Sequence, residues 1–161
     1  MASPNPLPQK PRLEIFDRTV ISKARHYAYK IARSAIFLIF FWFGVLKVFG
    51  ISPASPLVSA LLSRTLTCIP AAIFLPVFGL FECAIGILFL FPKCTRLTIC
   101  LIILHIATTF LPLVFLPSIA WTGPFVPTLE GQYIIKNVVI LALVVGLIGH
   151  MKPMRAEKHN A

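Results

Sequence analysis

The sequence predicts an all-α, polytopic membrane protein, a bundle of four transmembrane helices with both termini in the cytoplasm. Its 161 residues are 58% hydrophobic and only 12% charged, whereas about a quarter of the residues of a soluble domain are usually charged. The apolar residues gather in four runs of about twenty, and that many helical residues span about 30 Å, the thickness of the hydrocarbon core. Lys and Arg gather near the ends of these runs, as in membrane proteins.

The four runs predict the limits of the spans. They lie at about residues 31–50, 70–91, 97–117 and 134–150. Pro76 falls inside the second run and Pro112 inside the third, where a proline bends a helix. Four spans joined mostly by short connections predict an up-down bundle.

The connections differ in character. Residues 52–69 contain prolines and a leucine pattern that predicts a short interfacial helix. Residues 92–96 predict a tight basic turn, and residues 118–133 predict a loop. Trp121 and Tyr133 of this loop are expected at headgroup depth, where aromatic side chains are enriched.

Basic segments flank the four-span domain, which is assigned to residues 31–150. Residues 1–30 form a predicted cytoplasmic tail, in which residues 12–30 carry apolar side chains at helical spacing. This part predicts an amphipathic helix on the membrane surface or an extension of the first span. A solvated basic linker is the alternative. Residues 151–161 form a second cytoplasmic basic tail.

The topology follows from the distribution of positive charge. Of the 15 Lys and Arg residues, seven lie in the amino-terminal segment through Arg33, two in the second connection and three in the carboxyl-terminal tail. The other three, Lys47, Arg64 and Lys136, belong to the opposite side, so the positive-inside rule places both termini in the cytoplasm. The basic residues are therefore expected to bind anionic lipid headgroups and not nucleic acid.

One carboxylate, Glu82, lies near the middle of the second span. Left charged and unpaired at that depth, it costs about 2.5 kcal/mol or more. It shares a helix face with Gly79, Cys83 and Gly86, and such a face is expected to turn into the bundle. His105 of the third span lies roughly 12 Å from the inner membrane border and Glu82 roughly 13 Å, so the two can meet.

Other polar residues lie near the outer ends of the spans. The predicted arrangement is a deep Glu82/His105 pair below an outer cluster of Lys47, Glu130 and Lys136. Lys47 can also reach down towards Glu82. Snorkelling of Lys47 and Lys136 to headgroups, and a packing role for His105, are the alternatives. The candidate ligand-binding cluster comprises Lys47, Glu82, His105, Glu130, Lys136 and Asn137.

Common catalytic and metal-binding patterns are missing from the sequence. Its four cysteines form no Cys-x-x-Cys, and no Cys/His spacing resembles a zinc site, so neither a metal site nor a structural disulfide is predicted. There is no phosphate-binding loop and no nucleophile–base motif. The chain is therefore not expected to be an enzyme on its own, and no catalytic residue is assigned.

Several motifs also resemble a known family. These are Phe-Trp-Phe-Gly-Val-Leu-Lys at 41–47, Gly-Leu-Phe-Glu-Cys-Ala-Ile-Gly-Ile-Leu at 79–88, Thr-Thr-Phe at 108–110 and Leu-Glu-Gly-Gln-Tyr-Ile-Ile-Lys-Asn at 129–137. In this order they resemble the DoxX-like superfamily, within it the YkgB/RclC-type small inner-membrane proteins of bacteria. The resemblance covers residues 31–149 and places Lys47, Glu82 and Lys136 at the family's polar positions.

The resemblance implies a multi-pass protein of the bacterial inner membrane but no single reaction. Some members are subunits of a thiosulfate:quinone oxidoreductase, others are linked to oxidative or chlorine stress, and related animal proteins assist receptor assembly. The missing Cys-x-x-Cys and the missing paired histidines within the spans argue against a thiol-redox or haem-based electron carrier.

Three functions therefore stay open. The first is a membrane subunit of a redox or stress-response system that binds a quinone or a similar amphipathic molecule, with a soluble oxidoreductase as partner. No covalently bound cofactor is expected. The second is a proton-coupled transporter of small solutes, with Glu82 as the proton site, which would need a homo-oligomer. The third is a non-catalytic assembly or scaffold protein.

Overall fold

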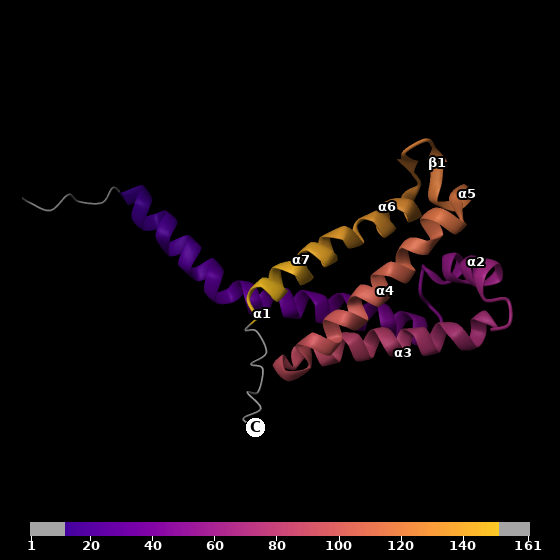
Figure 1. Ribbon diagram of the computed structural model, residues 1–161, viewed down its shortest axis with the longest axis horizontal. Helices are drawn as coiled ribbons and strands as arrows, with labels where there is room; N and C mark the ends of the chain where they lie inside the picture. Colours follow the sequence, from indigo (N-terminus) through magenta and orange to yellow (C-terminus); the bar gives the residue numbers. More distant parts are fainter. Residues whose placement is uncertain (1–11, 152–161) are drawn as a thin grey trace, which may run out of the picture.

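A computed structural model describes residues 12–151, and these are mostly helical (Figure 1). The elements are α1 (Arg12–Val48), α2 (Ser55–Thr65), α3 (Ala71–Leu90), the 3-10 turn η1 (Pro92–Cys94), α4 (Thr95–Phe115), α5 (Pro117–Ala120), strands β1 (Trp121–Gly123) and β2 (Val126–Pro127), α6 (Leu129–Ile135) and α7 (Asn137–Gly149). The outer parts of the predicted basic tails, residues 1–11 and 152–161, lie outside the described residues.

Four helical segments are long and apolar enough to cross a membrane, as predicted. They are Glu14–Val48, Ala71–Leu90, Pro92–Phe115 and Leu129–Gly149. The second agrees with its predicted limits to within one residue at each end. The fourth begins at Leu129, five residues before the predicted limit of 134. The hydroxyl of Thr128 explains the early start, because it accepts a hydrogen bond from the Gly131 N–H at 3.1 Å and caps the helix.

The predicted amphipathic segment and the first span form one continuous helix, α1. No glycine or proline interrupts residues 12–43, so nothing in the sequence ends the helix at the membrane border. Residues 14–31 are exposed, and this part of α1 projects away from the other helices (Figure 1). Of the two helical alternatives, the structure forms the extension of the first span.

The connections follow the predictions in part. The short helix expected within residues 52–69 is α2, and the tight turn is η1. The prediction of a loop at 118–133 is wrong, since this segment holds most of α5, an antiparallel β1–β2 hairpin and the start of α6. Trp121 pairs with Pro127 in the hairpin, and its indole N–H donates to the carbonyl of Leu113 at 2.9 Å. The hairpin is the exception to the predicted all-α class.

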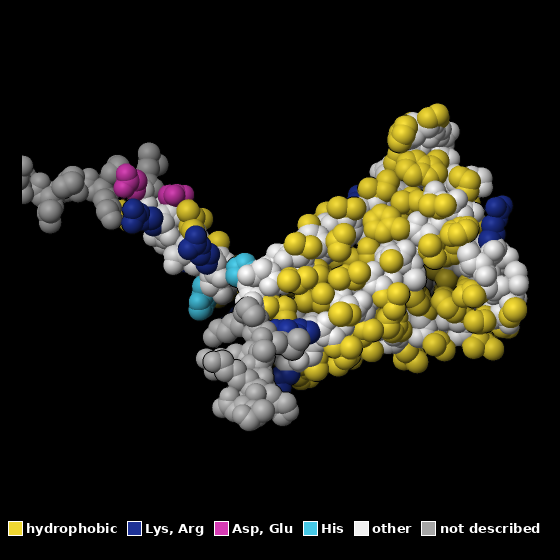
Figure 2. Space-filling view, viewed as in Figure 1, with side chains coloured by type: hydrophobic (Ala, Val, Ile, Leu, Met, Phe, Trp, Pro, Cys, Tyr) yellow, Lys and Arg dark blue, Asp and Glu magenta, His cyan; other side chains and the backbone are white. Residues whose placement is uncertain are grey.

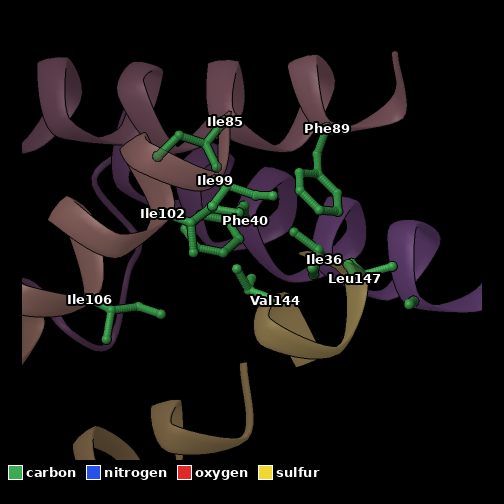
Figure 3. Packing of buried hydrophobic residues seen from close by; sticks show 10 residues of the cluster. Ile36, Phe40, Ile85, Phe89, Ile99, Ile102, Ile106, Val144 and Leu147 are labelled. Carbon is green, nitrogen blue, oxygen red and sulfur yellow. The ribbon is translucent and has the colours of Figure 1, made fainter. Parts of the chain in front are cut away.

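Helices α1, α3, α4 and α7 share one apolar core (Figure 3). The buried side chains that form it are Ala32, Ile36, Phe40, Ile85, Phe89, Ile99, Ile102, Ile106, Val144 and Leu147. Many large apolar side chains nevertheless point outwards, among them Trp42 and Val145, which are 59% and 60% exposed. Apolar side chains cover most of the visible face of the bundle (Figure 2). Exposed apolar surface of this extent is expected where the surrounding solvent is lipid.

Glycines let α1 and α3 approach at the backbone. A Cβ added to Gly44 would lie 2.5 Å from the carbonyl oxygen of Gly79, and one added to Gly79 would lie 2.6 Å from that of Gly44. One added to Gly86 would meet the Phe41 nitrogen at 3.0 Å. Gly44 thus contacts Gly79 while the earlier Phe41 contacts the later Gly86, so the two helices are antiparallel. Small residues allow this close packing in a membrane.

Candidate functional site

Three polar side chains from three helices meet inside the bundle, and we name Lys47, Glu82 and His105 the triad. Lys47 on α1 donates to both carboxylate oxygens of Glu82 on α3, at 2.8 and 2.6 Å. His105 on α4 places its Nε2 atom 3.5 Å from Glu82 Oε1. The three side chains are 7%, 6% and 11% exposed. The structure therefore brings Glu82 and His105 together at one level, as predicted.

The glycine contacts position the ion pair. Lys47 lies three residues after Gly44, and Glu82 lies three residues after Gly79, so each shares a helix face with its glycine. Because the glycines bring the two backbones together, the lysine side chain reaches the carboxylate directly. The alternative that Lys47 extends to headgroups is not what the structure forms, since the residue is only 6% exposed.

His105 lies in an aromatic environment. Its ring stacks on Phe78 with centroids 5.2 Å apart, and Phe40 approaches it edge-on at 5.1 Å. Phe81 lies further off at 6.3 Å. The second ring nitrogen, Nδ1, is buried and has no hydrogen-bond partner. Buried polar atoms normally have a hydrogen-bond partner, and this nitrogen has none within the protein. It can therefore form a hydrogen bond with a ligand.

The triad combines a buried ion pair with an imidazole ring. The opposite charges of Lys47 and Glu82 attract each other, and this attraction offsets part of the free-energy cost of burying them. Lys47 also lies 5.6 Å from the centre of the Phe78 ring. The site therefore offers a cation, an acceptor, a histidine nitrogen and flat aromatic surface within one small volume.

The other three candidate residues stay apart from the triad. Among residues 12–151, both ion pairs involve Glu82, so the outer cluster of Lys47, Glu130 and Lys136 does not form. Glu130 and Lys136 are exposed, and Asn137 is half-buried. Lys136 lies between α6, which ends at Ile135, and α7, which begins at Asn137. From there its ammonium lies 4.9 Å from the centre of the Tyr133 ring.

The polar residues at the start of the fourth span do not face the interior of the bundle. Tyr133 and Lys136 are exposed, while Ile134, Val144 and Leu147 are buried. The reason is position along the helix, because a lysine close to the end of a span can reach headgroup depth through its long stem. Glu82 at mid-depth has no such route.

Sequence reasoning missed a third buried charged residue besides Lys47 and Glu82, namely Arg33 on α1. It is 5% exposed and donates a hydrogen bond to the Thr95 hydroxyl on α4 at 2.8 Å. The sequence does carry a signal for it, since Arg33 and Lys47 are two heptads apart and therefore lie on one face of α1. Because Arg33 also belongs to the positive charges that set the topology, its burial was not predicted.

No group of three His, Cys, Asp or Glu side chains that could hold a metal ion is found in the described part of the chain. The cysteines Cys68, Cys83, Cys94 and Cys100 are free thiols. The thiol closest to the triad, that of Cys83, lies 3.6 Å from the carbonyl oxygen of Phe41, which it faces as a donor.

The geometry defines a class, a helical protein with four segments able to cross a membrane and a buried Lys–Glu–His cluster between three of them. In comparisons with known proteins, no family model, no curated protein and no solved structure matched the chain. The resemblance to the DoxX-like superfamily stays a prediction from the sequence motifs.

Proposed function

We propose that this chain is a four-span membrane protein of the DoxX-like type whose triad binds the polar headgroup of a small amphipathic molecule, with a quinone as the leading candidate. Such a protein would serve as a membrane subunit of a redox or stress-response system. The observation that carries the proposal is the buried, unpaired Nδ1 atom of His105 beside the Lys47–Glu82 pair. It offers a hydrogen bond in a site otherwise lined by apolar and aromatic side chains.

The aromatic rings suit a flat headgroup. Phe78 and Phe40 already hold the planar His105 ring by stacking and edge contact. A quinone ring could replace one of these contacts while its carbonyl oxygen accepts from Lys47, or from His105 in the tautomer that carries its proton on Nδ1. His105 is the most exposed member of the triad at 11%, so the headgroup would enter from its side as the imidazole turns.

The test measures binding of decylubiquinone to the protein in phosphatidylcholine nanodiscs by equilibrium dialysis. H105F keeps the aromatic packing and removes the ring nitrogens, so affinity should fall about tenfold or more, the value of one good buried hydrogen bond. T108V changes an exposed hydroxyl on the same helix and should bind as the wild type does. Equal affinity of H105F and wild type, or no binding by the wild type, would contradict the proposal.

A scaffold role is the second candidate, and the glycine contacts favour it. The close approach of α1 and α3 at Gly44 and Gly79, locked by the Lys47–Glu82 pair, makes a rigid surface suited to assembling partners. If wild-type protein binds no quinone and E82Q lowers only stability, this role replaces the first. A proton flux in proteoliposomes that is lost in E82Q would instead indicate the proton-coupled transporter.

The proposed location is the bacterial inner membrane, with both termini in the cytoplasm. The hydrogen bond from Arg33 to Thr95 places the basic turn η1 at the end of the bundle from which the basic part of α1 projects (Figure 1). Arg64 lies at the opposite end with α2. An impermeant maleimide should therefore label Cys68, exposed between α2 and α3, from the outside of intact cells. Labelling of Cys68 only after lysis would indicate the opposite orientation, with both termini outside the cytoplasm.

A further inference from the structure

The third buried charged residue, Arg33, lies near the other end of the bundle and is separate from the triad. Its guanidinium is flanked by the rings of Tyr29 and Phe89, each with its centre 5.0 Å from the central carbon. Phe89 belongs to α3 and projects into the core beside Ile36 (Figure 3). The rings cover faces of the guanidinium and leave its edges for hydrogen bonding.

Only one of the three guanidinium nitrogens is satisfied. The Nη1 atom donates to the hydroxyls of Tyr29 and Thr95. The Nε and Nη2 atoms are buried and have no hydrogen-bond partner. These two nitrogens form one edge of the planar group, a side-on pair of parallel donors. A buried donor without a partner costs about 1–3 kcal/mol, and more for a charged group, so this edge is a strong site for an acceptor.

The described residues supply no counter-charge in this region. Both ion pairs of residues 12–151 involve Glu82, so no described carboxylate pairs with Arg33. Ring contacts offset part of the cost of burying the cation, but they provide no acceptor for Nε and Nη2. The missing partner is therefore expected to be an anion with two oxygens that face the same way.

The surroundings of Thr95 favour an anion as well. Thr95 is the first residue of α4, a helix of 21 residues, and its N-cap Cys94 makes no side-chain capping bond. The N–H of Thr95 itself donates to the carbonyl of Pro92 in η1. The amide groups that follow it in the first helical turn present the positive end of the helix close to Arg33. Such a helix end attracts anions, phosphate groups in particular.

We propose that Arg33 is the centre of an anion site that binds a phosphate-type oxyanion through its Nε/Nη2 edge, beside the amino terminus of α4. Guanidinium recognises this group through two parallel hydrogen bonds. The phosphate belongs either to an acidic lipid headgroup or to a free ion. Tyr29, 36% exposed, is the outermost member of this site, so the anion enters as its ring turns away.

The test compares melting temperatures of the full-length chain in phosphatidylcholine nanodiscs, in the same discs with phosphatidylglycerol, and in the first discs with inorganic phosphate replacing chloride. Stabilisation by phosphatidylglycerol alone assigns the site to a lipid headgroup, and stabilisation by inorganic phosphate assigns it to a free ion. R33Q should abolish either shift. K93Q removes the same charge from an exposed side chain at this end of the bundle and should keep the shift.

A conservative variant keeps the test decisive if R33Q fails to fold. R33K retains the charge but presents a single point donor, and its half-saturating anion concentration should rise about tenfold. The proposal is overturned if neither anion stabilises the wild-type protein. It is equally overturned if the R33K and wild-type proteins respond alike, because the guanidinium edge then contributes nothing.

Discussion

Substitution of Lys47 by Met should destabilise the protein strongly. The ammonium donates to both oxygens of a carboxylate whose residue is 4% exposed, at 2.8 and 2.6 Å. Removal of one partner from a buried ion pair leaves an uncompensated charge and costs about 3–5 kcal/mol. His105 offers little relief, because its Nε2 atom is 3.5 Å from Glu82, beyond a good hydrogen bond.

The double substitution K47M/E82Q should recover most of that loss. It leaves no buried charge, and replacement of both partners of a buried pair is often close to neutral. The expected coupling free energy between positions 47 and 82 is therefore about 2–4 kcal/mol. Ordinary polar contacts between membrane helices couple by about 0.6 kcal/mol, with a maximum near 1.7. A measured value above that maximum identifies a desolvated ion pair.

The assay is reversible unfolding in dodecyl sulfate, followed by circular dichroism, for the wild type, the two single variants and the double variant. K136M and E130Q serve as the matched control, because the structure leaves both residues exposed and unpaired with each other. Their effects should be small and additive. The changes in unfolding free energy caused by K47M and E82Q could add to within about 0.5 kcal/mol, as those of independent sites do. That result would show that the buried pair does not exist in the folded protein.

Two further substitutions test the helix packing and the start of the fourth span. G79V should lower unfolding stability by more than about 2 kcal/mol, because even a Cβ at this position would lie 2.6 Å from the Gly44 carbonyl oxygen; G146V, where an added Cβ meets nothing within 4 Å, should be nearly neutral. T128A should cost about 1 kcal/mol, since its hydroxyl caps α6 by accepting from Gly131. Both are read from the same dodecyl sulfate titration, and equal stability of G79V and G146V would refute the close contact.

The limits of the long apolar helices and the meeting of Glu82 with His105 could be predicted from the sequence because both follow from counting. Apolar runs set the helix lengths, and the rise per residue places Glu82 and His105 at one level. The structure confirms their proximity at 3.5 Å. The sequence does not decide whether Lys47 contacts Glu82 directly, because this contact depends on how closely α1 and α3 approach at their glycines.

Other features depend on tertiary contacts that carry little local pattern. The β1–β2 hairpin has only five strand residues, too few for a period-two pattern, and Trp121 bonds to α4 through Leu113. The burial of Arg33 requires Thr95 and Phe89, which lie far from it in the sequence. The prediction of an outer cluster is wrong for a related reason. Lys47 pairs with Glu82, and Lys136 lies on the surface.

Photolabelling tests the central claim most directly, that the triad receives a flat polar headgroup. The wild type and H105F, both in nanodiscs, are illuminated with an azidoquinone, and the labelled peptides are identified by mass spectrometry. The account predicts labels on α3 and α4 around Phe78, Phe81 and His105, which excess decylubiquinone suppresses and H105F loses. Labels spread over the outward-facing side chains of all four spans, unchanged in H105F, would contradict it.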